Sequence, residues 1–183
     1  INNKRVRILG LAAVSIVLGQ LGAWTWIQYR RYRECRTEVQ MVQVQGNSMA
    51  GILTPGQSVR VEMNYYLCNE MRRGDVVLFR QSAFSLPLVK RALVLPGDQF
   101  DIFANGDVTS LIVNSEFLLT AQRRPLLLSK ESARYLRDLR ERWDGILPRD
   151  HYLVFGTENE TSSDSRNFGP VSREQLLGRV IEP

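Results

Sequence analysis

The sequence has little of what most metal-dependent and hydrolytic sites require. Its 183 residues include one histidine, His151, and two cysteines, Cys35 and Cys68, which form no Cys-x-x-Cys pair. A structural zinc site normally takes four cysteine or histidine ligands at close spacing, so we expect no metal site. The chain has no glycine-rich phosphate-binding loop, and we expect no cofactor. Two cysteines could form a disulfide if the domain lies outside the cytoplasm.

The positive charge is concentrated at one end of the chain. The formal net charge is +5, from 24 Lys and Arg against 19 Asp and Glu. Residues 1–36 hold seven basic residues and one acidic residue, which leaves 17 basic and 18 acidic groups for the rest of the chain. No nucleic-acid-binding motif occurs. Basic residues that flank an apolar stretch favour contact with anionic lipid headgroups over binding to nucleic acid.

That apolar stretch covers residues 8–27 and contains no charge. At about 1.5 Å per residue, a helix of this length spans about 30 Å, the thickness of a bilayer core. Trp24 and Trp26 lie near one end, where aromatic rings favour the membrane interface. We expect residues 1–38 to form a cytoplasmic stub, a transmembrane anchor and a linker. A cleavable signal peptide is the alternative, and basic residues on both sides leave the orientation open.

From residue 39 onward the sequence is typical of a β-rich domain. Apolar and polar residues alternate in residues 39–45 and 58–63, as they do in half-buried strands. Further β-rich runs between turn residues occupy 74–79, 86–95, 100–108, 110–119 and 151–156. Residues 129–143 instead have apolar residues at helical spacing. The predicted fold class is mainly β: a compact β-sheet domain at 39–183 with one helical insertion, behind a single N-terminal transmembrane helix.

A serine activated by something other than histidine is the catalytic arrangement that the composition leaves open. A Ser-His-Asp triad would have to use His151, which lies in an apolar strand run where a packing or edge role is favoured. Lysine can replace histidine when burial lowers the pKa of its amino group. The neutral amine then takes the serine hydroxyl proton and later gives it to the leaving amine.

Several segments resemble the sequence boxes of the type I signal peptidases. Residues 45–53, QGNSMAGIL, resemble the family's nucleophile box, and residues 88–98, LVKRALVLPGD, resemble the box that holds its catalytic lysine. Residues 72–79 match the strand between these two boxes, and residues 156–171 are similar to the last box. The boxes stand in the family's order and cover most of residues 39–181. The chain is therefore identified as resembling this family of Ser-Lys serine peptidases.

The resemblance implies a catalytic role for two residues and a binding role for a third. Ser48 would be the nucleophile that attacks the scissile carbonyl. Lys90 would be the general base, surrounded by apolar neighbours on a strand. Met49 would line the substrate pocket. The substrate would add as an extended strand with small side chains in two shallow pockets.

The last box implies supporting residues, and departures from the family pattern occur both there and in the nucleophile box. Ser162 would hydrogen-bond the lysine amine, whereas Asp164 and Arg166 would form a charged pair that supports the site. Gly46 stands where some members carry a hydroxyl that completes the oxyanion hole, so that donor is absent here. Residues 157–159, Thr-Glu-Asn, replace the usual Gly-Asp-Asn run. That turn therefore departs from the family pattern.

The expected function is a membrane-anchored serine endopeptidase that cleaves N-terminal signal peptides from exported precursor proteins. The resemblance implies a single-pass protein of the bacterial plasma membrane, with its catalytic domain on the extracytoplasmic side. Its expected partners are precursor proteins and the lipid bilayer, and in addition a secretion or conjugation machinery. Two alternatives remain: a specialised peptidase that matures pilins in conjugative transfer, and a catalytically inactive, membrane-tethered peptide-binding module. Intact Ser48 and Lys90 argue against the inactive module.

Overall fold

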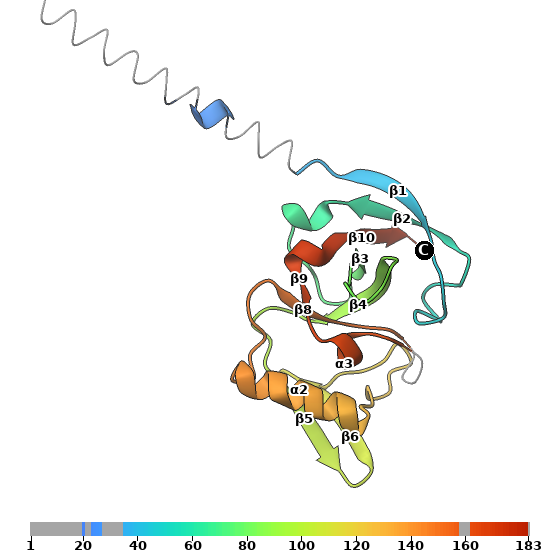
Figure 1. Ribbon diagram of the computed structural model, residues 1–183, viewed down its shortest axis with the longest axis vertical. Helices are drawn as coiled ribbons and strands as arrows, with labels where there is room; N and C mark the ends of the chain where they lie inside the picture. Colours follow the sequence, from blue (N-terminus) through green and yellow to red (C-terminus); the bar gives the residue numbers. More distant parts are fainter. Residues whose placement is uncertain (1–19, 21–22, 27–34, 158–161, 183) are drawn as a thin grey trace, which may run out of the picture. The chain divides into compact units, whose positions relative to one another are not determined.

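The computed structural model describes residues 20, 23–26, 35–157 and 162–182 (Figure 1). The chain divides into two units, Ile1–Arg36 and Thr37–Pro183, which are described separately. In the first unit, the described residues 20 and 23–26 are helical. Most of the anchor predicted at 8–27 lies outside the described residues. Among those that are described, no helix combines the length and the apolar character needed to cross a membrane.

The second unit is mainly β, as the sequence predicts. Its larger sheet has seven described strands in the order β1-β2-β10-β3-β4-β8-β9, and neighbouring strands are antiparallel. The strands are β1 (Glu38–Gln43), β2 (Ser58–Met63), β3 (Val76–Phe79), β4 (Leu88–Val94), β8 (His151–Phe155), β9 (Val171–Ser172) and β10 (Leu176–Glu182). The last strand of the chain, β10, lies between β2 and β3 and so ties the two ends of the domain into one sheet.

A smaller sheet and the main helix form the other part of this unit. The sheet comprises β5 (Phe100–Asn105), β6 (Val108–Val113) and β7 (Glu116–Phe117), and α2 (Lys130–Arg142) packs against β5 and β6. The predicted helix is confirmed to within one residue at each end. The Ser129 side chain accepts the backbone N–H of Ser132 and thereby caps the helix. In the β5–β6 hairpin, Asn105 pairs with Val108, so the turn begins at Gly106, which has a φ of 59°.

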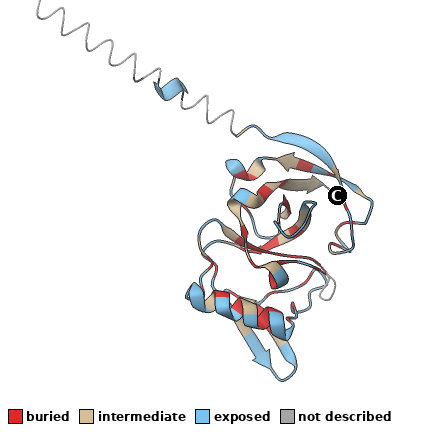
Figure 2. Ribbon diagram, in the orientation of Figure 1, coloured by how far each residue is buried: buried red, intermediate tan, exposed pale blue. Residues whose placement is uncertain are grey.

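Buried residues are concentrated in the inner strands β3, β4 and β8 of the larger sheet and along one side of α2 (Figure 2). Side chains of a strand alternate between its two faces. Strand β8 accordingly places Leu153 and Phe155 in the core beneath α2, and Tyr152 and Val154 in the core on the other face. This strand therefore belongs to both cores and links the two parts of the unit.

Three short helices interrupt the strands: η1 (Tyr65–Leu67), α3 (Ser165–Phe168) and η2 (Arg173–Gln175). The sequence indicated only a polar, turn-rich segment at 157–170, because a four-residue helix is too short to show a period. Both cysteines, Cys35 and Cys68, are disulfide-bonded, and neither is a free thiol.

Candidate active site

Ser48 lies in a tight turn that follows β1. Gly46 and Gly51, with φ values of 78° and 83°, adopt a left-handed conformation that is costly for other residues. The turn closes on itself, since the backbone N–H of Leu53 donates to the Met49 carbonyl at 2.8 Å. Met49 is 2% exposed and packs in an apolar cluster with residues of β2 and β3. The buried side chain of Met49 thus anchors the turn and leaves the adjacent serine partly exposed.

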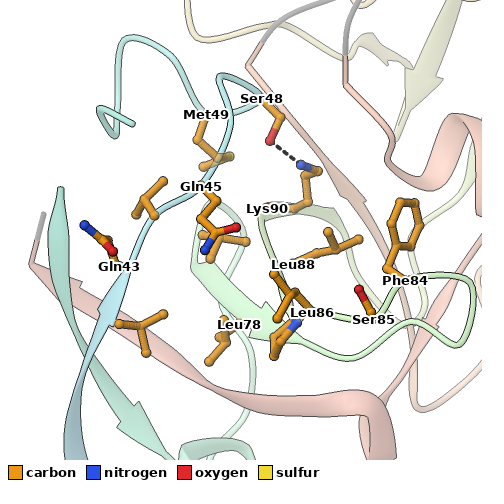
Figure 3. A pocket seen from close by; sticks show the side chains of 14 residues that line it. Gln43, Gln45, Ser48, Met49, Leu78, Phe84, Ser85, Leu86, Leu88 and Lys90 are labelled. Atoms are coloured by element: carbon orange, nitrogen blue, oxygen red, sulfur yellow. Dashed lines mark hydrogen bonds between the residues drawn. The ribbon is translucent and has the colours of Figure 1, made fainter. Parts of the chain in front are cut away.

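Lys90 reaches this serine from the middle of the sheet. It lies on β4, where it pairs with Val77 of β3, and it is 3% exposed. Its Nζ and the Ser48 Oγ are joined by a hydrogen bond of 2.5 Å (Figure 3). The structure therefore brings together the two residues that the sequence boxes single out.

The surroundings of Lys90 favour its neutral form. Burial lowers the pKa of Lys90 from 10.5 to about 8, because an ammonium group loses its hydration in an apolar site. The Asp164 carboxylate acts in the opposite direction on this pKa, and the Arg166 guanidinium lowers it. A lysine with such a pKa can accept a proton near neutral pH.

Asp164 and Arg166 form a buried ion pair behind the lysine. Arg166 donates from Nε and from one terminal nitrogen to the two carboxylate oxygens of Asp164, at 2.8 and 2.7 Å. The pair is fully enclosed, with side-chain exposures of 4% and 0%. Asp164 also accepts the backbone N–H of Gly156 at 2.9 Å and caps α3. The pair therefore fixes the end of β8 to the segment that carries α3.

Ser162 lies against the same strand end. Its hydroxyl is buried, and within the described part of the chain it has no hydrogen-bond partner. The bond to the lysine amine that the resemblance implies is therefore not formed in this structure, and its role stays a prediction. A Cβ placed on Gly156 would collide with the Ser162 hydroxyl and lie 2.5 Å from the Ser48 carbonyl oxygen. Position 156 consequently has space only for glycine.

An apolar cleft of about 390 Å³ opens beside Ser48 and Lys90 (Figure 3). Residues 42–45, 48–49, 78 and 84–90 line it. Strand β1 is at the edge of the larger sheet, and on β4 residues 88–90 pair with β3, whereas pairing with β8 begins at Arg91. Among the described strands, neither β1 nor this part of β4 has a partner on its other side. Two unpaired strand edges thus border the cleft.

Comparison with known proteins identifies the family to which this chain belongs. The family model described as signal peptidase, peptidase S26, matches residues 35–183. The chain belongs to the type I signal peptidase family. It is 29% identical over 148 residues to signal peptidase IB of Staphylococcus aureus, covering 75% of this chain and 73% of that protein. It is 27% identical over 179 residues to the probable signal peptidase I-2 of Synechocystis sp., covering 94% and 70%.

Among solved structures, a signal peptidase I from Enterococcus faecalis aligns with a TM-score of 0.37 and 19% identity. The alignment covers 61% of this chain and 97% of that one. Members of the signal peptidase family are serine endopeptidases, and this protein is accordingly an enzyme of that class.

The single histidine of this protein, His151, is not among the residues of the candidate active site. His151 is the first residue of β8 and pairs with Ser172 of the edge strand β9. Its Nδ1 is 2.9 Å from the Arg149 carbonyl oxygen, and its ring packs against Trp143 at 5.7 Å between centroids. Roughly 13 Å of extended chain separates it from Phe155 at the other end of β8, next to the residues that hold the Ser48 turn. Of the packing or edge role predicted for it, packing is confirmed by this ring contact, whereas β8 lies between β4 and β9 among the described strands and is not an edge strand.

One residue at the site was not singled out by the sequence. The backbone N–H of Thr157 donates to the Ser48 carbonyl at 2.8 Å, and its hydroxyl donates to the Ala50 carbonyl at 2.6 Å. In the sequence, Thr157 stands out only as a departure from the family's usual residues after Gly156. A threonine directly after an apolar strand run was the signal available in the sequence, but it does not reveal a partner more than a hundred residues away.

Proposed function

We propose that this peptidase is a membrane-anchored enzyme that cleaves N-terminal signal peptides from exported precursor proteins with a Ser48–Lys90 dyad. The observation that carries the proposal is the hydrogen bond between Lys90 Nζ and Ser48 Oγ beside an apolar cleft. The names of the signal peptidases to which the chain is similar support this substrate class.

In the proposed reaction, neutral Lys90 takes the proton of the Ser48 hydroxyl while Oγ attacks the scissile carbonyl carbon. The resulting oxyanion would accept hydrogen bonds from the Ser48 backbone N–H and from a second donor. When the C–N bond breaks, the lysine ammonium gives its proton to the leaving amine. A water molecule, deprotonated by the same lysine, then attacks the acyl-enzyme carbonyl. As the ester bond breaks, the lysine gives that proton to Ser48 Oγ, which restores the free serine and the neutral amine.

The cleft suits an extended peptide with small side chains near the scissile bond. The unpaired edges of β1 and β4 offer backbone hydrogen bonds to a strand laid between them. Met49 and Leu78 are both buried and line the cleft, so the space beside Ser48 has an apolar floor. Such a floor accommodates alanine or glycine and excludes charged side chains, whose desolvation is costly.

Other parts of the chain have supporting roles in this proposal. Residues 8–27 would be the single-pass anchor in a bacterial plasma membrane, with the domain at 39–183 on the extracytoplasmic side. The disulfide-bonded state of both cysteines supports this location, since disulfides are rare in the cytosol. Asp164 and Arg166 would hold the segment behind Lys90, and Ser162 would orient the lysine amine once it is deprotonated. A secretion machinery would supply the substrates.

The test is cleavage of a membrane-inserted precursor with an Ala-x-Ala site by the full chain in detergent. We expect the wild type to cleave and Ser48→Ala to be inactive. The control is Ser85→Ala, which removes an exposed hydroxyl of the same cleft and should retain cleavage. Cleavage by Ser48→Ala would remove this serine from the mechanism. A folded wild type that leaves the precursor intact would overturn the proposed substrate class.

A further inference from the structure

We propose that Thr157 is a positioning residue, whose hydroxyl holds the Ser48 turn in its reactive geometry. The inference rests on the proposed function, in which Ser48 is the nucleophile. Thr157 directly follows Gly156 beyond the end of β8 and is 2% exposed. Its side chain is thus fully enclosed at the point where β8 meets the turn.

Hydrogen bonds from Thr157 hold the turn at both sides of Met49. The backbone N–H of Thr157 binds the Ser48 carbonyl at 2.8 Å, and the hydroxyl binds the Ala50 carbonyl at 2.6 Å. By contrast, the N–H groups of Ala50 and Leu53 bond to carbonyls within the turn itself. The contacts from Thr157 therefore fix the turn relative to the sheet, which the internal bonds cannot do.

The same strand end is tied to the lysine side of the site. The N–H of Gly156 donates to Asp164, whose carboxylate is close enough to Lys90 to raise the pKa of its amine. Gly156 thus binds the segment behind Lys90, and the next residue, Thr157, binds the turn that carries Ser48. The position of Thr157 consequently sets the distance between the two reacting side chains.

The side chain has to be a hydrogen-bond donor for this purpose. A valine would fill the same volume, but the Ala50 carbonyl would lose its bond and the turn would be held at one side only. Since misplacement of a reacting group by about 1 Å can cost a hundredfold in rate, a small shift is enough to be measured. Serine keeps the hydroxyl and should largely keep the geometry.

The experiment compares Thr157→Val, Thr157→Ser and a matched control, Thr120→Val, in the full chain. Thr120 is also buried, at 7% exposure, and its hydroxyl accepts a backbone N–H from Arg124 within the smaller-sheet region. We expect Thr157→Val to lower kcat roughly tenfold to a hundredfold with KM within about twofold. Thr157→Ser should restore most of kcat, and Thr120→Val should leave both constants unchanged.

Amide hydrogen exchange gives a second readout that does not depend on cleavage. In Thr157→Val, the amides of residues 47–53 should exchange faster than in the wild type, and in Thr120→Val they should not. Unchanged kcat together with unchanged exchange in Thr157→Val would overturn the inference, as would an equal loss of kcat in Thr157→Ser. A wild type that does not cleave would count against the proposed function alone, since the exchange data still decide whether Thr157 holds the turn.

Discussion

The core beneath α2 and the end of β8 bury different kinds of side chain. The core beneath α2 consists of apolar residues, mainly leucine, valine and phenylalanine. The end of β8 instead buries a cluster of polar and charged side chains: Lys90, Thr157, Ser162, Asp164, Ser165 and Arg166. Burial of apolar surface stabilises a fold, whereas a buried charge costs free energy unless it is paired. The core beneath α2 therefore stabilises the unit, whereas the end of β8 uses some of that stability to keep a lysine buried with a lowered pKa.

The sharpest test of this comparison is Lys90→Met, which replaces the buried amine with an apolar chain. Cleavage should fall by roughly 10⁴-fold or more, because the proposed general base is gone. The free energy of unfolding at pH 7 should rise by up to about 3 kcal/mol, since the pKa of Lys90 is lowered from 10.5 to about 8. That penalty is complete below pH 8 and disappears as the pH rises towards 10.5.

Precursor cleavage and urea unfolding of Lys90→Met measure the two effects. Arg91→Met, at the neighbouring half-buried position of β4, is the control and should retain activity. A Lys90→Met protein that still cleaves would exclude lysine as the base.

Asp164→Ala should have the next largest effect, on stability. It leaves the Arg166 guanidinium buried without its carboxylate and removes the acceptor of the Gly156 N–H. Breaking such a buried pair costs about 3–5 kcal/mol. The control is Glu62→Ala, which breaks the partly exposed pair with Arg179 and should cost about 0–1 kcal/mol. Equal losses in urea unfolding would contradict the distinction between these pairs.

Leu136→Ala tests the apolar core beneath α2 by itself. Leu136 is fully buried in the core beneath α2, so its truncation should cost about 2–5 kcal/mol of unfolding free energy. At temperatures where the variant stays folded, kcat should equal that of the wild type. The neighbouring exposed residue gives the control, Arg137→Ala, with little change in either quantity. A selective loss of kcat in folded Leu136→Ala would show that the two parts are coupled.

The pH profile should show the smallest change in kcat/KM between neighbouring measurements. Because the base must be neutral, kcat/KM should rise about tenfold per pH unit below the pKa of Lys90 and level off above about pH 8. Cleavage assays from pH 5 to 9 measure this slope. A flat profile with chemistry rate-limiting would contradict a lysine base.

Much of the fold could be predicted because it depends on local patterns. Alternation of apolar and polar residues located β1 and β2, and the spacing of Leu136 and Leu139, with Ser129 before them, located α2. The short helix α3 was not predicted, because it depends on one capping carboxylate, that of Asp164, more than on any period.

The site depends on contacts that local patterns do not contain. Ser48 and Lys90 are 42 residues apart, and only their likeness to ordered family boxes suggested that they meet. The bond from Thr157 to Ala50 spans 107 residues and depends on how β8 ends. That the Ser162 hydroxyl has no hydrogen-bond partner among the described residues likewise depends on its packing against Gly156, which no spacing in the chain encodes.

The lack of space at Gly156 limits how genes for this protein can diverge. Any other residue there would push its Cβ towards the Ser48 carbonyl oxygen and the Ser162 hydroxyl together. We therefore expect a single codon change to disable the enzyme while both members of the proposed dyad, Ser48 and Lys90, remain intact. We expect gene copies that encode another residue at this position to have lost peptidase activity. Position 156 would then distinguish active copies from inactive ones.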